Sequence, residues 1–212
     1  MAIDLDEAKV NRSEFTLWLG WTLATAAGMI LGFVPFAFLA PDVNVLVIRL
    51  LLPLVAGVLV GLFQWLVLRP YLTRAVDWVF HGGAGWALGF ALGLVVIEAM
   101  GKNPLGALLG YVLFGLIIGA LQWPMLRREI PHVATWVIAS SLGWALGAYL
   151  GRAALNILAA GGEVSPVVTT AVISGVTGLV AGAITGLALV WIVRQPDLPT
   201  APAAAPGGRR QP

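Results

Sequence analysis

The sequence predicts an all-α transmembrane fold, a six-helix bundle made of three tandem two-helix hairpins with a pseudo-threefold axis along the membrane normal. Three observations carry this prediction. Of the 212 residues, 59% are hydrophobic and only 10% are charged, and apolar stretches with similar glycine and tryptophan patterns return along the chain. Soluble domains usually carry about 25% charged residues, whereas a chain in a bilayer needs few because its surface faces lipid. The mean hydropathy of +0.93 agrees with a membrane protein.

Six apolar segments are long enough to cross the hydrocarbon core as helices, which takes about 20 residues. They cover residues 15–39, 45–68, 78–100, 104–126, 133–159 and 166–193. None alternates polar and apolar residues as a barrel strand does, so helices are expected throughout. Pro104 and Pro166 suit the first turns of their helices, while Pro35 and Pro53 are expected to kink or end theirs.

Around a membrane domain of residues 15–194, we expect a cytoplasmic N-terminal segment of residues 1–14 and a disordered cytoplasmic tail of residues 195–212. The tail is rich in Pro, Ala and Gly and has no apolar face to bury. Cytoplasmic loops carry an excess of Lys and Arg. Of the twelve such residues, all but Arg49, Lys102 and Arg152 fall on the side of the termini. Both termini of this multi-pass protein are therefore predicted to be cytoplasmic.

The repeated patterns define three hairpins, at about residues 15–69, 78–128 and 133–194. In the odd segments, Gly-Trp pairs end at Trp21, Trp86 and Trp144. Each even segment has a G-x-x-x-G pair, and an arginine lies eight residues after the second glycine of each pair. A sequence pattern that recurs in this way indicates that one supersecondary unit is repeated three times along the chain.

The G-x-x-x-G pairs and two glutamines on the same helix faces are predicted to hold helices together, because glycine lets backbones approach closely in lipid. These helix-packing residues are Gly57, Gly61, Gln64, Gly115, Gly119, Gln122, Gly182 and Gly186. In the third repeat, Leu189 takes the place of the glutamine. Glutamine in a substrate path is the alternative interpretation. Another three glycines are expected to face lipid, where a partner would dock: Gly106, Gly110 and Gly178.

All nine tryptophans fall toward the predicted cytoplasmic side. An interfacial aromatic belt explains Trp65 and Trp123, each of which lies one turn before an arginine. Trp86 and Trp144 lie about two turns inside their helices and are expected to fill space between hairpins. The alternative is a docking surface for a partner or for a flat hydrophobic ligand.

Ionisable and polar residues inside spans are the first functional candidates in a membrane protein. The candidate polar or ligand site consists of four residues in the outer half: Glu98, Arg152, Asn156 and Arg49. Glu98 and Arg152 would pair across hairpins, which lowers the cost of burying both charges. The alternative is that Glu98 and Arg49 extend to the outer headgroups.

The sequence favours neither an enzyme nor a metal or cofactor site. It has no cysteine, and its two histidines, His81 and His132, fall at the cytoplasmic edge outside any metal-binding motif. No Ser-His-acid set shares a face. The few basic residues lie in loops, so nucleic acid is not an expected partner.

The motif G-x-x-Q-W-x-x-L-R occurs at Gly61–Arg69 and again at Gly119–Arg127. It resembles a pattern of small bacterial multi-pass membrane proteins, and this resemblance implies an inner-membrane location but no functional residue. Mitochondrial carriers also use three two-helix repeats, but their P-x-[DE]-x-x-[KR] signature is absent from the odd segments.

Three functions fit these observations. The first is a non-enzymatic structural or accessory subunit that packs through glycine faces against itself or other membrane subunits. The second is a small transporter or channel, with the polar residues of the outer half lining a passage. The third is a pigment- or lipid-binding protein that uses the tryptophan-rich half.

Overall fold

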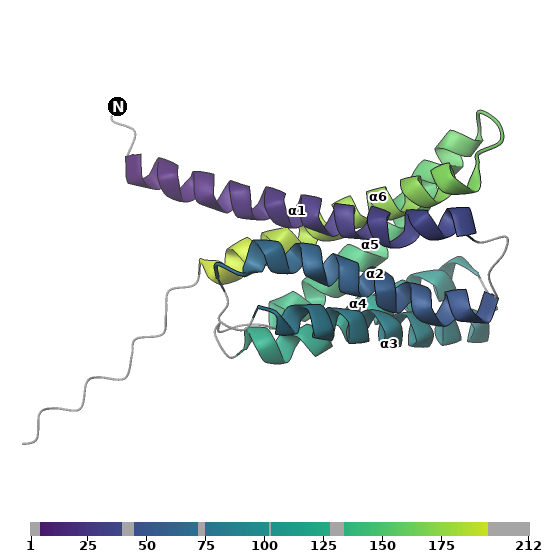
Figure 1. Cartoon of the computed structure of the whole chain (residues 1–212), viewed down its shortest axis with the longest axis horizontal. Coiled ribbons are helices and arrows are strands. Elements are labelled where there is room, and N and C mark those ends of the chain that lie inside the picture. Colours follow the sequence, from purple (N-terminus) through teal and green to yellow (C-terminus); the bar gives the residue numbers. More distant parts are fainter. Residues whose placement is uncertain (1–4, 40–44, 72–74, 102, 128–133, 195–212) are drawn as a thin grey trace, which may run out of the picture.

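The computed structural model describes residues 5–39, 45–71, 75–101, 103–127 and 134–194 (Figure 1). In this part of the chain there are six helices and no strand: α1 Leu5–Leu39, α2 Val45–Leu68, α3 Asp77–Ala99, α4 Pro104–Leu126, α5 Ala134–Ala159 and α6 Pro166–Val193. The all-helical prediction is confirmed, and each helix covers one of the six predicted segments. The predicted tail, residues 195–212, lies outside the described residues.

The starts of α4 and α6 agree with the sequence prediction, whereas the start of α1 does not. At α4 and α6 a proline occupies the first turn, and the side chains of Asn103 and Ser165 accept backbone N–H groups at 2.8 and 3.3 Å. α1 instead begins at Leu5, within the segment expected to precede the membrane domain. Pro35 and Pro53 lie inside α1 and α2 and end neither helix.

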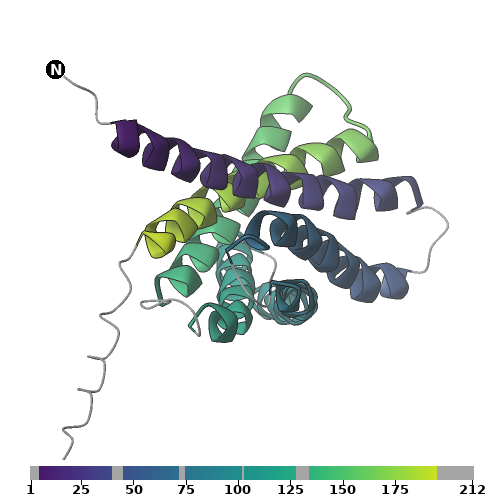
Figure 2. The same cartoon turned by 60° about the vertical axis from the view of Figure 1, so that its left-hand side comes forward.

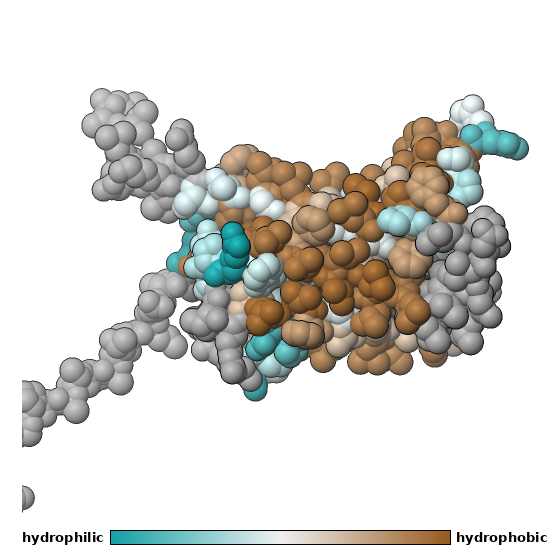
Figure 3. All heavy atoms as spheres, viewed as in Figure 1, coloured by the Kyte–Doolittle hydropathy of each residue, from teal (hydrophilic) through white to brown (hydrophobic). Residues whose placement is uncertain are grey.

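Five helices are long and apolar enough to cross a membrane: α1, α2, α3, α4 and α6. This supports a multi-pass membrane protein. α5 does not meet the same hydropathy criterion, since it carries two serines, three glycines and Arg152. Figure 3 shows hydrophobic side chains over the middle of the bundle and hydrophilic ones toward its two ends. Large apolar side chains such as Phe80, Tyr149 and Ile157 are two-thirds or more exposed, as expected where lipid replaces water.

The helices form a closed ring. Each helix contacts its neighbours in the chain, and α1 also contacts α6; Figures 1 and 2 show α1 between α6 and α2. Among the described residues, backbones on opposite sides of the ring do not approach one another. The centre of the bundle is therefore the place where side chains alone decide what is filled and what is open.

Glycines set the helix spacing within each hairpin. A Cβ on Gly28 would lie 2.5 Å from the Cα of Val60. One on Gly147 would lie 2.7 Å from the carbonyl oxygen of Thr177. Real Cβ atoms essentially never come so close to backbone, so these helices pack at distances that only glycine allows.

Glycines also set the spacing between hairpins, and the predicted packing glycines all lie at such contacts. Their facing helices are α3 for Gly57 and Gly61, α5 for Gly115 and Gly119, and α1 for Gly182 and Gly186. The expectation that Gly106, Gly110 and Gly178 face lipid is wrong. All three are buried, and a Cβ there would meet Met100, Ile97 and Ala26 at 2.6–2.7 Å. The chain itself covers these positions, with helices at Gly110 and Gly178 and with the connection between α3 and α4 at Gly106.

The core has two layers along the bundle. The first lies toward the end that carries Arg69, Arg127 and Arg194, which we term the arginine end, and it centres on Trp21, Trp78 and Trp136. The second lies toward the opposite end and centres on Trp86, Phe114 and Trp144. Beyond the second layer the centre is not filled.

Candidate functional site

A cavity of about 280 Å³ lies beyond the second core layer, toward the end opposite the arginine end, and we term it the bundle cavity. Five helices line it, with α2 as the exception. On this side α5 and α6 rise away from α3 and α4 in both views (Figures 1 and 2). The lining is mostly apolar and includes Met29, Phe33, Phe90, Leu94 and Ile97.

The floor of the bundle cavity is a cluster of three aromatic rings. Trp86 and Trp144 lie edge to face with centroids 5.0 Å apart, and Phe114 completes the cluster at 5.0 and 5.6 Å from them. All three side chains are buried. Edge-to-face rings attract one another beyond the effect of area burial, so the three rings stabilise one another and give the cavity an apolar floor.

Below the floor, Trp21, Trp78 and Trp136 form a second aromatic cluster. The three ring centroids are 5.6–5.7 Å apart and the planes cross at 69–76°. None of the three rings is more than 1% exposed. Each comes from a different odd helix, so the cluster closes the centre of the ring. In the part of the chain that the structure describes, the buried side chains of the two aromatic layers fill the centre of the ring.

Each indole N–H of this lower cluster donates to a polar side chain on an even helix. Trp78 donates to Gln64 Oε1 at 2.9 Å, and Trp136 donates to Gln122 Oε1 at 3.1 Å. Trp21 donates to Thr185 Oγ1 at 2.9 Å. A buried donor without a partner is costly, so these three acceptors are what allow tryptophan at the centre. Gln64 also donates from Nε2 to Thr25 Oγ1 at 2.9 Å and thereby joins α1, α2 and α3.

The spatial grouping of the tryptophans corrects the match made from Gly-Trp pairs. Trp21 packs with Trp78 and Trp136, not with Trp86 and Trp144. α3 and α5 each carry two tryptophans that are two turns apart on one face, and the Gly-Trp pattern selects the second of each. In α6, Thr185 and not Leu189 accepts an indole N–H, as the two glutamines do in α2 and α4.

One wall of the bundle cavity is polar. It comprises Arg152 of α5 and four hydroxyl residues of α6: Thr169, Thr170, Ser174 and Thr177. Three of these hydroxyls donate to backbone oxygens, Thr170 to Pro166 and Ser174 to Thr170 within α6, and Thr177 to Gly147 of α5. Their oxygens keep acceptor capacity, and a hydroxyl proton can rotate toward a different acceptor.

The structure does not assemble the four residues of the predicted polar site. Arg152 lines the bundle cavity, and its side chain is exposed at the mouth. Glu98 and Asn156 are exposed and are not part of the lining. Arg49 falls in α2, but its side chain is outside the part that the structure describes. Only Arg152 of the four therefore contributes to the cavity.

The hydroxyl wall is the part of the site that sequence analysis missed. Thr170, Ser174 and Thr177 recur at helical spacing, which places them on one face of α6. That spacing was a usable signal. The sequence prediction was based on charged side chains instead. The uncharged hydroxyl residues of an apolar helix did not stand out from their neighbours.

The arginine end carries a different set of contacts. The guanidinium carbons of Arg69 and Arg127 lie 6.0 and 5.1 Å from the ring centroids of Trp65 and Trp123. Arg194 forms a bidentate salt bridge with Glu14 that joins α6 to α1. Hydrogen bonding to this carboxylate raises the pKa of the Arg194 guanidinium above its ordinary value.

Comparison with known protein families, with curated proteins and with solved structures finds no match to this chain. The site must therefore be interpreted from its own geometry. No group of three His, Asp or Glu side chains among the described residues could hold a metal ion. His81 contacts the carbonyl oxygen of Asp77 in its own helix at 2.8 Å, and His132 is outside the described residues. What the arrangement offers is a closed-ended, mostly apolar cavity with one polar wall.

Proposed function

We propose that this chain is a non-enzymatic, multi-pass membrane protein that binds a small apolar or amphipathic molecule in the bundle cavity. The bundle cavity itself is the observation that carries the proposal. At about 280 Å³ it is near the lower end of small-molecule sites. An aromatic floor, apolar sides and a few polar groups are the usual composition of such sites.

We infer six membrane spans, including α5, with both termini in the cytoplasm of a bacterial inner membrane. α4 and α6 flank α5 in the ring, so the helix is shielded from lipid on two sides. Its residues Ser140, Gly143 and Gly147 are buried against these neighbours. The positive-inside rule supports the orientation, because Arg69, Arg127 and Arg194 share one end.

We also propose that three hairpins repeat around a pseudo-threefold axis, in a register set by glycine contacts. Within the hairpins, Gly28 faces Val60, Gly85 faces Ile118 and Gly143 faces Ala181. In this register Gly178 and Gly182 correspond to the first two G-x-x-x-G pairs. Gln64, Gln122 and Thr185 then fall at equivalent positions, as do the three tryptophans that they accept from.

The geometry favours ligand binding over the other two functions. An accessory subunit that packs through glycine faces needs those faces free, and in this chain its own helices occupy them. A channel needs a passage, and two aromatic layers fill the centre. Binding requires only the bundle cavity, which is present and lies above an intact floor.

The test places a bulky side chain in the bundle cavity at a position outside its aromatic floor. Ala148 lines the bundle cavity, and Ala148→Phe places a ring in it. Binding of a brominated medium-chain alcohol to the protein in phosphatidylcholine nanodiscs is followed by quenching of tryptophan fluorescence, since Trp86 and Trp144 lie in the lining. We expect Ala148→Phe to bind the alcohol at least about tenfold more weakly than the parent protein, as measured by quenching.

The matched control is Ala91→Phe, an exposed position outside the lining, which should bind the alcohol as the parent protein does. Saturable quenching that is unchanged by Ala148→Phe would locate binding elsewhere and refute the proposal. So would the absence of saturable quenching in the parent protein.

A further inference from the structure

The polar side chains of the bundle cavity come almost entirely from the third hairpin. α5 and α6 supply Arg152 and the four hydroxyl residues, whereas α1, α3 and α4 contribute a single polar side chain, Tyr111. A cavity that only had to accommodate lipid tails would need none of these groups, because polar atoms are expensive in hydrocarbon.

The third hairpin also creates the space. In the register of the glycine contacts, Ala148 corresponds to Phe33 and Phe90 of the other two hairpins. Thr177 corresponds to Phe114, since Gly147 faces Thr177 as Gly89 faces Phe114. The second hairpin therefore has phenylalanine at both positions and the first has Phe33 with Ala56, whereas the third hairpin has the smaller residues Ala148 and Thr177 where the centre of the bundle opens. The counterpart of Arg152 in the second hairpin is Leu94, which is apolar.

The charge lies at one end of the cavity and the aromatic rings at the other. Trp144, Ala148 and Arg152 follow one another at intervals of about one turn on the same face of α5. Arg152 follows Trp144 by eight residues, which corresponds to a rise of about 12 Å along the axis of α5. Thr177, Ser174 and Thr170 run alongside on α6 in the same direction.

Among the residues that the structure describes, Arg152 forms no salt bridge with a carboxylate. A cation at the mouth of an apolar cavity attracts an anion, and the planar guanidinium binds oxyanions through two parallel hydrogen bonds. The ligand that satisfies both ends has an oxyanion head at Arg152 and an apolar body on the aromatic floor.

Resting on the proposed function, we propose that the bundle cavity binds a single-chain amphiphile with an oxyanion head group, held by Arg152 and the α6 hydroxyls. The volume of about 280 Å³ favours a ligand with one chain, because it lies at the lower end of the roughly 300–1,000 Å³ of small-molecule sites.

The experiment compares three brominated probes on the same nanodisc preparation: a medium-chain carboxylate, the alcohol of equal chain length, and a two-chain phosphatidylglycerol. Arg152→Gln and Arg152→Lys are measured beside the parent protein. We expect the carboxylate to bind about tenfold more tightly than the alcohol, and Arg152→Gln to remove this preference. Arg152→Lys should keep part of it. Added salt should weaken binding of the carboxylate and leave the alcohol unaffected.

The outcomes separate the two proposals. If alcohol and carboxylate bind equally, and Arg152→Gln changes neither, the anionic head is refuted while the cavity proposal stands. If the phosphatidylglycerol probe quenches in a manner that Ala148→Phe abolishes, the single-chain ligand is refuted. If no probe depends on Ala148, the proposed function itself fails. The alcohol serves as the fold control for both arginine variants, because it needs the cavity and not the charge.

Discussion

At the scale of single residues, a tryptophan at the centre of a membrane bundle needs an acceptor for its indole N–H. Lipid offers none, so the partner must come from a neighbouring helix. Gln64, Gln122 and Thr185 meet this need for Trp78, Trp136 and Trp21. The polar residues around the lower cluster are thus explained by packing, without a substrate path.

Gln64→Leu should be more destabilising than Gln122→Leu. Gln64 makes two hydrogen bonds to other helices, to Trp78 and Thr25, whereas Gln122 accepts from Trp136. We expect Gln64→Leu to lower the free energy of unfolding by about 1–3 kcal/mol, since it leaves buried polar groups without partners. Thermal unfolding in detergent, followed by tryptophan fluorescence, measures the difference. Leu187→Ala, at an exposed position, is the control, and equal melting of both glutamine variants would contradict the argument.

At the scale of the element, each helix of the ring packs through small residues on two faces. Between α4 and α5 a Cβ on Gly115 would lie 2.5 Å from the carbonyl oxygen of Ser140. A backbone atom cannot rotate away as a side chain can, so the two helices would have to separate. On α1, by contrast, a Cβ on Gly20 would be 3.8 Å from the nearest atom, a methyl group of Val67.

The pair Gly115→Ala and Gly20→Ala tests this contrast with the same chemical change. Gly115→Ala should destabilise the bundle by roughly 1–3 kcal/mol through overpacking. Gly20→Ala should be neutral or stabilise by up to about 1 kcal/mol, because alanine costs less entropy in a helix. Melting temperature and monodispersity in detergent report both variants. A Gly115→Ala protein as stable as the parent would show that α4 and α5 are not packed as described.

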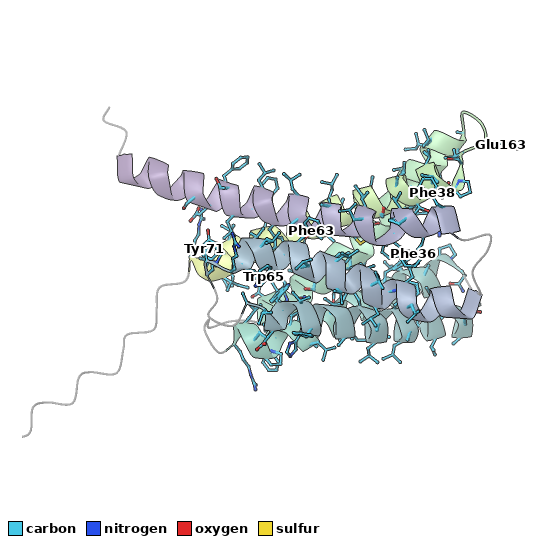
Figure 4. All side chains as sticks on the ribbon, in the orientation of Figure 1. Phe36, Phe38, Phe63, Trp65, Tyr71 and Glu163 are labelled. Carbon is cyan, nitrogen blue, oxygen red and sulfur yellow. The ribbon has the colours of Figure 1, made fainter. Side chains whose placement is uncertain are left out.

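At the scale of the whole molecule, the ring has two unlike ends. Figure 4 shows Tyr71 at the arginine end and Glu163 at the opposite end, where the bundle cavity lies. The proposed orientation puts the mouth of this cavity on the outer side of the membrane. The lower aromatic cluster then separates the cavity from the cytoplasm.

The chain has no cysteine, so single-cysteine variants can test this orientation directly. A membrane-impermeant maleimide should label Glu163→Cys in intact cells. Tyr71→Cys should react only after the membrane is permeabilised, because the positive-inside rule places it in the cytoplasm. Both positions are exposed, which makes each the control for the reactivity of the other. The reversed labelling pattern would invert the orientation.

The sequence by itself determined the class of fold, the number of helices and most of their bounds. Apolar length, prolines at Pro104 and Pro166, and scarce charge are local properties, and local properties fix where a helix can form. Arg152 was also recognisable, because a charged residue within an apolar helix stands out in sequence. The early start of α1 at Leu5 was missed, because polar composition hides helical propensity from a search for apolar segments.

Only the tertiary structure decided which residues meet at the centre. In each later hairpin, two tryptophans two turns apart could correspond to Trp21. Which of them packs against Trp21 depends on the axial offset between the packed helices. In the proposed register the same packing places Thr185 where the other hairpins have glutamine. It also decides that Gly110 and Gly178 face other helices and that Gly106 faces Met100. The bundle cavity follows from the same cause. In the proposed register, Ala148 and Thr177 leave room where the second hairpin has Phe90 and Phe114, and the meeting of these side chains depends on packing between helices, which no local pattern encodes.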